Sequence, residues 1–282
     1  AGLQSAPVAA ASWRYDCSAP VIGSGVAKLV ADNLATAAAA KTWAALAAAP
    51  AITAQISATG IVAHWGAVSD AHSSIASVQI AVGTVSSPSA VQAFTSLASV
   101  SDEGGAFSGF TLALGVQYVV TVLARDAAGN TATVTSNSVT IDFTAPTAGT
   151  VLDVAPFVWN DATVASASPE SFAWGAGQDN EWVGVTTAVA VVCRGFQEAQ
   201  SAFMQYEVAV GSGASGAAQH DVVDWVVMSP GPLTTATTVG SLRSSLSLAN
   251  GNTYFTSCRV SNSLGLSTTV VSDGFTVDTA SP

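Results

Sequence analysis

The chain has 282 residues, a net charge of −11 at pH 7, and only seven Lys and Arg. That length allows two ordinary domains with a core each, and 49% apolar residues exclude a solvated disordered tail. The scarcity of cations excludes binding to nucleic acid or to an anionic membrane surface through clustered positive charge.

Residues 14–20, “RYDCSAP”, form a short phrase that returns twice. It is echoed by “TIDFTAP”, which ends at Pro146, and by “TVDTASP”, which ends at Pro282. A phrase repeated at this spacing is typical of the joint between repeated modules. We therefore expect residues 1–19 to be the last strand and linker of a preceding module, cut from a longer array.

An Ala-rich stretch near residues 33–48 comes next. Ala has the highest helix propensity, Asp32 or Asn33 could cap a short helix, and Pro50 would end it. The alternative is an Ala-biased loop or strand. Because Ala is weakly hydrophobic and Lys41 and Pro50 interrupt the run, no membrane-spanning helix is expected.

Alternation of apolar and polar residues with period two predicts strands at 118–126 and 254–262. Each is followed by a Gly-containing turn and a short last strand. Before them, the spacing L-x-x-G-x-x-Y predicts a corner in which the Tyr hydroxyl bonds to backbone. Two early tryptophans are expected to fill the space between two sheets. The predicted core residues are Trp65, Trp174, Leu112, Tyr118, Leu248 and Tyr254.

The chain repeats itself. A shift of 136 positions lays residues 112–146 on 248–282 without a gap, and “SVQIAVGT” at 77–84 corresponds to “QYEVAVGS” at 205–212. This predicts one module at 20–146 and another at 147–282. Matching Trp65 with Trp174 leaves an excess in the second module, which we interpret as an insertion at 183–202.

Each module resembles a fibronectin type III or related immunoglobulin-like module, with an early Trp, L-x-x-G-x-x-Y and a V-x-A-x-N/D-x-x-G hairpin. “WGAVSDAHSSIASVQIAVGT” and “SDGFTVDTASP” are similar to modules of large extracellular proteins of algae and other protists, although Ser74 and Val78 depart from that pattern. The resemblance implies an all-β fold: tandem Ig-like or fibronectin III-like β-sandwiches joined by short Pro-ended linkers. It also implies an extracellular or cell-surface location, similar to flagellar-surface and mastigoneme-type glycoproteins.

Motifs for catalysis are weak. His64, Asp70 and His72 lie close together in the sequence, but a zinc site needs more ligands and a triad needs a rigid nucleophile and base. We interpret these histidines as surface-loop residues. No catalytic or cofactor-binding residue is predicted, and the protein is not expected to be an enzyme.

Three aspartates, Asp16, Asp142 and Asp278, recur just before the proline of each joint. Calcium takes about six to eight oxygen ligands and would stiffen a hinge between modules, which makes them candidate calcium ligands. One Asp per joint is too few to establish a site. The alternative is that each Asp ends a strand through side-chain–backbone hydrogen bonds.

The three cysteines are expected to have different roles. Cys193 and Cys258 are both extra relative to the first module, so a disulfide within the second module is predicted, with buried thiols as the alternative. Cys17 is then left for a partner in another chain or an earlier segment.

These observations favour a structural, non-catalytic segment of a long extracellular repeat protein, which builds a filament or cell-surface coat through module–module contacts. Its expected partners are other copies or segments of the same array and other surface proteins, and its many Ser and Thr could carry O-glycans. One alternative is an adhesive or ligand-binding module that uses the 183–202 insertion with Trp182, Phe196 and Phe203. Another is an accessory region of a secreted enzyme.

Overall fold

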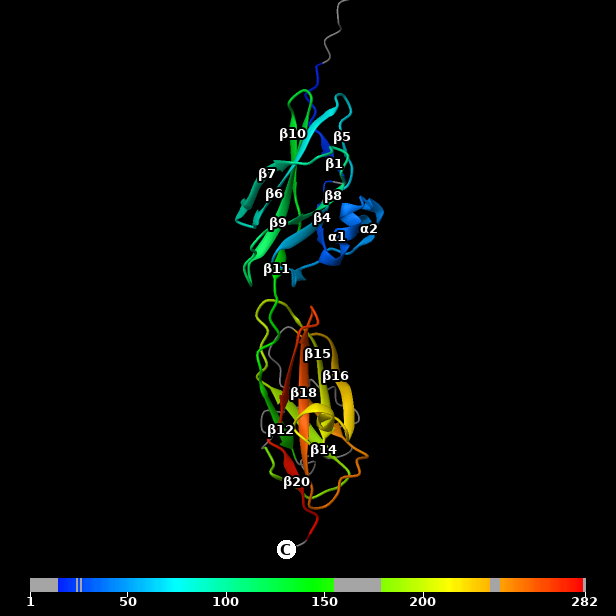
Figure 1. The fold of residues 1–282 in the computed structure, drawn as a ribbon, viewed down its shortest axis with the longest axis vertical. Helices are drawn as coiled ribbons and strands as arrows, with labels where there is room; N and C mark the ends of the chain where they lie inside the picture. The colour runs from blue at the N-terminus through cyan, green and yellow to red at the C-terminus, as the bar shows by residue number, and fades with distance from the viewer. Residues whose placement is uncertain (1–14, 24, 26, 155–178, 234–238, 281–282) are drawn as a thin grey trace, which may run out of the picture. The chain divides into compact units, whose positions relative to one another are not determined.

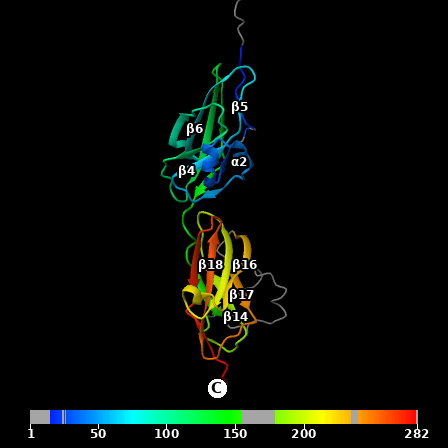
Figure 2. The same cartoon turned by 45° about the vertical axis from the view of Figure 1, so that its right-hand side comes forward.

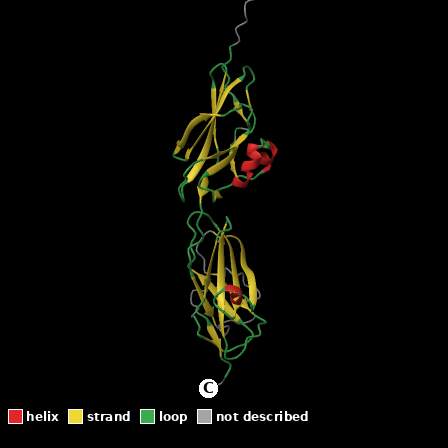
Figure 3. Ribbon diagram, viewed as in Figure 1, coloured by secondary structure: helices red, strands yellow, loops and turns green. Residues whose placement is uncertain are grey.

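The computed structural model describes residues 15–23, 25, 27–154, 179–233 and 239–280, which fall into two compact units. Unit 1 is Ala1–Val139 and unit 2 is Thr140–Pro282. Each unit is a β-sandwich (Figure 1, Figure 3), so the predicted all-β fold of tandem Ig-like modules is confirmed. No helix in the described part has the length and apolarity that crossing a bilayer requires.

The described part of unit 1 holds β1 to β10, the start of β11, and the helices α1 and α2. The elements are β1 Val21–Ile22, β2 Lys28–Val30, a 3₁₀ helix η1 Asp32–Leu34, α1 Ala35–Ala39, α2 Trp43–Ala48, β3 Ala54–Gln55, β4 Gly60–His64, β5 Val68–Ser69, β6 Ile75–Thr84, β7 Ser87–Ser96, β8 Gly104–Ser108, β9 Gln117–Asp126, β10 Thr131–Thr135 and β11 Val139–Ile141. The division between the units therefore falls within β11, upstream of Pro146.

Two sheets face each other in unit 1. One has the order β2-β4-β8 and the other β3-β11-β9-β6-β7, with β10 also paired to β9 and with β1 and β5 forming a separate pair. Apolar side chains of β4, β6 and β9 form much of the buried core of unit 1, and Val62 of β4 packs with residues of α1 and α2.

Unit 2 repeats this plan (Figure 2). Its elements are β12 Thr150–Val154, β13 Trp182–Val183, β14 Val189–Arg194, β15 Phe203–Gly211, a 3₁₀ helix η5 Gly216–Gln219, β16 Val223–Leu233, β17 Val239–Arg243, β18 Thr253–Asn262, β19 Ser267–Val271 and β20 Phe275–Val277. The sheets have the orders β12-β14-β17 and β13-β20-β18-β15-β16, with β19 paired to β18.

The strand register shows which residues of the two units occupy the same place. The β2–β4 pair sets Leu29 opposite Ala63, and the β12–β14 pair sets Asp153 opposite Val191. An offset of 128 relates the start of β6 at 75 to the start of β15 at 203, and the same offset places Ala63 on Val191 (191 − 63), so that Leu29 corresponds to Asp153. The stretch from β4 to β6 thus corresponds to the stretch from β14 to β15 without a gap.

This correspondence corrects the predicted insertion at 183–202. That segment contains β14, which pairs with both β12 and β17 and is therefore part of the sandwich. By the same offset Cys193 occupies the place of Trp65, and both are buried. The residue matched with Trp65 from the sequence, Trp174, lies outside the described residues.

Two of the three aromatic residues expected on a recognition surface at that segment are buried. Phe196 and Phe203 are buried in the core of unit 2, where both rings pack against Tyr206. Trp182 alone of the three predicted aromatics is exposed, at 63%. Matching Trp65 with Trp174 had assigned Phe196 and Phe203 to a loop, whereas both belong to the sandwich core.

The Ala-rich stretch of unit 1 is helical, as predicted, but as two short α-helices after a 3₁₀ turn. Neither Asp32 nor Asn33 caps a helix with its side chain. Leu46 and Ala38 pack with Val30 of β2 and Val62 of β4, and the two helices lie beside β4 in Figure 1. The Lys28 ammonium donates to the carbonyls of Ala47 (2.6 Å) and Ala49 (2.5 Å), and so pairs with the end of α2.

The tyrosine corner occurs in both units. The Tyr118 hydroxyl accepts a hydrogen bond from Ala113 N–H and the Tyr254 hydroxyl from Ala249 N–H, each at 2.9 Å. Gly115 in the first corner has φ 75°, a left-handed conformation that glycine adopts without strain. The other predicted core residues that are described, Trp65, Leu112 and Leu248, are buried.

Candidate functional site

The aspartate of each joint makes a local turn. Asp16 Oδ1 accepts hydrogen bonds from the Ser18 backbone N–H (3.0 Å) and hydroxyl (2.7 Å). Asp142 Oδ1 does the same with Thr144, at 3.0 and 2.9 Å. Asp278 Oδ1 accepts from Ala280 N–H at 2.9 Å. The alternative offered for these residues, strand termination by side-chain–backbone hydrogen bonds, describes the geometry of all three joints.

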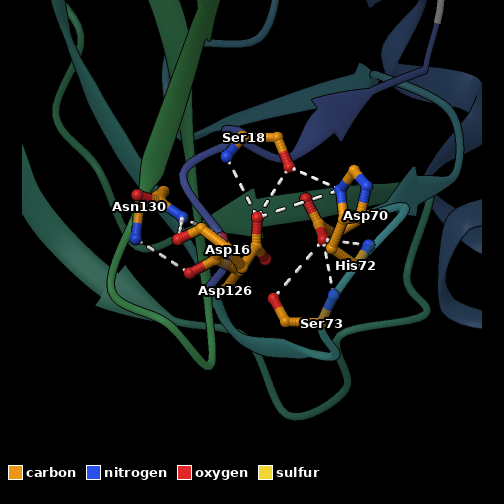
Figure 4. A network of polar contacts seen from close by, with 7 residues as sticks. All are labelled: Asp16, Ser18, Asp70, His72, Ser73, Asp126 and Asn130. Carbon is orange, nitrogen blue, oxygen red and sulfur yellow. Dashed lines mark hydrogen bonds and ion pairs between the residues drawn. The ribbon is translucent and has the colours of Figure 1, made fainter. Parts of the chain in front are cut away.

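In unit 1 the joint lies against two loops, and we call Asp16, Asp70, His72, Asp126 and Asn130 the unit 1 pole (Figure 4). Asp70 Oδ1 accepts from the backbone N–H groups of His72 and Ser73, both at 2.8 Å. Asp126, the last residue of β9, accepts from the N–H and the amide of Asn130, and that amide also donates to the Asp16 carbonyl at 3.3 Å. The turns therefore hold three carboxylates at one end of the unit.

The electrostatics of the unit 1 pole centre on Asp16. Its side chain is 5% exposed, and its Oδ2 is buried without a hydrogen-bond partner in the described structure. Hydrogen bonds from Ser18, then from Ser73, lower the pKa of Asp16 to about 2, and His72 contributes in the same direction. One ligand atom each of Asp16, Asp70 and His72 lies within 4.8 Å of the others, a spacing that could hold a metal ion.

In unit 2 the equivalent pole is Asp142, Glu198 and Asn262. Glu198 takes the place of Asp70, because its Oε1 accepts from the N–H groups of Gln200 (3.1 Å) and Ser201 (3.4 Å). Asn262 stands where unit 1 has Asp126, by the 136-residue shift. Its Nδ2 donates to Asp142 Oδ2 at 3.1 Å and to Glu198 Oε2 at 3.2 Å.

The three calcium candidates thus differ. The Asn262 amide fills the space between the acids around Asp142 with a hydrogen-bond donor, which leaves less capacity for a cation. Asp16 keeps a buried oxygen without a donor. Asp278 is exposed, and its carboxylate accepts the hydrogen bond of the turn from the Ala280 N–H. The residues that complete the poles, Asp126, Glu198 and Asn262, were missed from the sequence. The sequence feature that could have identified them is the offset of 128 between residues 77–84 and 205–212, which extends unchanged towards the N-terminal joint of each unit.

The cysteines form one disulfide. Cys193 of β14 is bonded to Cys258 of β18, with their Cα atoms 6.2 Å apart. The bond joins the two sheets through the core of unit 2. It does not clip an insertion onto the sandwich, because β14 is itself a sandwich strand. Cys17 is a free, exposed thiol beside Asp16 in the first joint.

Comparisons with known proteins assign neither a family nor a function to this chain. The chain matches no protein-family model and no curated protein. Among solved structures it is similar to the FN1–FN3 domains of chicken CNTN1, at 11% identity and a TM-score of 0.30, covering 77% of this chain and 64% of that one. It is also similar to a run of domains from titin, at 12% identity and a TM-score of 0.40, covering 89% of this chain and 66% of that one. In both cases the chain spans slightly less than two thirds of the matched structure.

Proposed function

We propose that this chain is a non-catalytic, load-bearing segment of a long extracellular repeat protein that builds a filament or surface coat. The observation that carries the proposal is the repeated joint. Asp16 and Asp142 make the same turn at the start of successive units, and each turn is held against the loops of the unit that follows it. A turn that is hydrogen-bonded to the module that follows it leaves less free chain between modules, which suits a spacer that transmits force.

The disulfide supports the extracellular part of the proposal. Structural disulfides persist in oxidising compartments and are rare in the cytosol of most organisms. The bond between Cys193 and Cys258 closes 65 residues across the two sheets. Under tension it would prevent that part of unit 2 from extending, so unit 2 would remain short even after its sandwich opens.

Single-molecule stretching of the whole chain, held at its two ends, tests this role. We expect two discrete unfolding steps, one for each unit. Reductant should lengthen the step of unit 2 by about 230 Å, because 65 residues at about 3.6 Å each are released. The double variant Cys193→Ala/Cys258→Ala is the control, and its steps should not respond to reductant. Gradual extension without steps would contradict a load-bearing role.

Cys17 is the proposed point of attachment to a neighbouring chain or segment. It is exposed and lies in the first joint. Non-reducing mass measurement and light scattering on native material should show a covalent assembly that Cys17→Ser abolishes. A free Cys17 thiol in native material would rule out this attachment and leave contacts between modules as the means of assembly.

The adhesive alternative loses its original support, because Phe196 and Phe203 are buried. An accessory role in a secreted enzyme rests on the sequence resemblance alone. Flagellar-surface location is likewise a proposal from that resemblance, and immunolabelling of intact cells would test it.

A further inference from the structure

A buried acid in unit 2 lies far from the joints. Asp153, in β12, is completely buried. Its Oδ1 accepts a hydrogen bond from the Thr256 hydroxyl at 2.5 Å. Its Oδ2 is also buried and has no hydrogen-bond partner in the described structure. A carboxylate oxygen in this state is costly, since ionised groups are buried only when they are paired or coordinated.

Two further carboxylates meet Asp153. One oxygen each of Asp153, Asp179 and Asp273 lies within 4.8 Å of the others, and the last two side chains are exposed. The Asp153 N–H donates to Asp179 Oδ1 at 2.9 Å, which fixes the loop before β13 beside the strand. None of the ion pairs found among the described residues includes any of these three acids. We call Asp153, Asp179 and Asp273 the acidic triad.

The positions in unit 1 that correspond to Asp153 and Asp273 are occupied by uncharged residues. Leu29 stands where unit 2 has Asp153, and by the 136-residue shift Asn137 stands where it has Asp273. In unit 1 the Asn137 amide satisfies the backbone at this place. Its Oδ1 accepts a hydrogen bond from the Leu29 N–H at 2.9 Å, and its Nδ2 donates to the Ile52 carbonyl at 2.7 Å. Unit 2 replaces a neutral, satisfied arrangement with three acids.

The environment disfavours the ionised form of Asp153. Burial raises its pKa to about 6, the hydroxyls of Thr256 and Ser272 only partly oppose this, and the Asp179 and Asp273 charges raise it further. A bound cation would remove both penalties, because it supplies a partner for the buried oxygen and neutralises the repulsion between the carboxylates.

We propose that the acidic triad binds a calcium ion. The ligands are oxygens only, which favours a hard cation over zinc or copper. Calcium accepts irregular geometry and mixes carboxylates with water, whereas magnesium requires near-octahedral ligands at shorter distances. Two exposed acids provide a route from solvent to the buried third one. The ion would tie β12 to the loops that precede β13 and β20.

Calorimetric titration of the whole chain, after treatment with EGTA, tests the proposal. Calcium should bind with a dissociation constant no weaker than about 1 mM, the range of extracellular modules, and more tightly than magnesium. Hydrogen exchange should show added protection at β12, β13 and β20. Absence of binding at millimolar calcium would overturn the proposal.

Three variants locate the site. Asp153→Asn and Asp273→Asn should each weaken calcium binding at least about tenfold, because each removes one of three charged ligands. Asp273→Asn also restores the residue type of unit 1, so it is expected to fold. Asp224→Asn is the matched control: it removes an acid of the same unit that is 83% exposed, and calcium binding should stay unchanged.

Stability without calcium separates a ligand from a merely structural acid. If Asp153 is a calcium ligand, Asp153→Asn should melt at the same or a higher temperature than the parent in EGTA and should lose the rise that calcium gives the parent. A lower melting temperature in EGTA with the calcium response intact would overturn the proposal. So would binding that survives Asp153→Asn but disappears in Asp16→Asn, because the ion would then belong to the unit 1 pole.

Discussion

The two units fill one place in the same sandwich with different chemistry. In unit 1 the Trp65 ring is buried, stacks on Phe107 at a centroid distance of 6.3 Å, and donates its indole N–H to the Asp102 carbonyl at 2.9 Å. In unit 2 that place belongs to Cys193, which is bonded to Cys258 of the facing sheet. A large buried ring and a covalent cross-link to the facing sheet thus occupy the same place in the two units.

The acids of the two units are also exchanged. Where unit 1 has Asp126 and Asn137, unit 2 has Asn262 and Asp273, by the shift of 136. Among the described residues, each unit therefore has one acid-rich cluster with a buried carboxylate oxygen that lacks a hydrogen-bond partner, on Asp16 in unit 1 and on Asp153 in unit 2. At the other place an amide supplies the hydrogen bonds. The two units therefore differ in where their acidic clusters lie, because Asp and Asn are exchanged at two corresponding backbone positions.

The largest expected effect comes from removing the ring. Trp65→Ala should destabilise unit 1 by about 3–5 kcal/mol, because it loses a buried aromatic side chain and leaves a cavity. Unit 2 should be unaffected, since it joins its sheets by the disulfide. Hydrogen-exchange mass spectrometry resolves the two units by peptide. Equal loss of protection in both would show that they unfold together.

Removing the cross-link should cost unit 2 about 4 kcal/mol, the value expected for opening a loop of this size in the unfolded chain. The variant is Cys193→Ala/Cys258→Ala, measured by differential scanning calorimetry. Reductant should reproduce the effect in the parent and leave the transition of unit 1 in place. A parent protein whose unit 2 transition ignores reductant would argue against a stabilising bond.

Converting the unit 2 pole to the unit 1 type should have a smaller effect. Asn262→Asp removes the donor shared by Asp142 and Glu198 and adds a third charge, at a cost of about 2–3 kcal/mol in unit 2. Urea denaturation measures it. The reverse change, Asp126→Asn, should cost less, because it removes a negative charge from beside Asp16. A greater loss from Asp126→Asn would contradict this order.

The smallest effect concerns pH. Burial, reinforced by Lys28, lowers the pKa of His64, whose Nε2 has no partner in the described part of the chain. The unfolded chain therefore binds the proton more readily than the folded one. Unit 1 should lose stability as pH falls from about 6.5 towards the folded-state pKa, and the loss should level off below it. His64→Phe should flatten this dependence in thermal melts of unit 1.

Sequence alone was enough for the fold class and for the second half of each unit. Period-two alternation, the glycine at each corner and the 136-residue shift define the strands around Tyr118 and Tyr254, because these patterns are local and repeat without gaps. The joint aspartates were also found, since their partners lie two residues away. The prediction was wrong where residues were matched by type and not by strand register. Because Trp65 was matched with Trp174, β14 was assigned to an insertion.

Only the tertiary structure decided what contacts each acid across the fold. Asp153 meets Asp179 and Asp273 from distant parts of the chain, and Asp142 meets Asn262 in the same way. A local sequence pattern does not predict these contacts, because they depend on how distant strands pair. The sequence by itself established two β-sandwiches with a recurrent joint. Which carboxylates are satisfied, and which keep a buried oxygen free for a cation, depends on long-range register and burial.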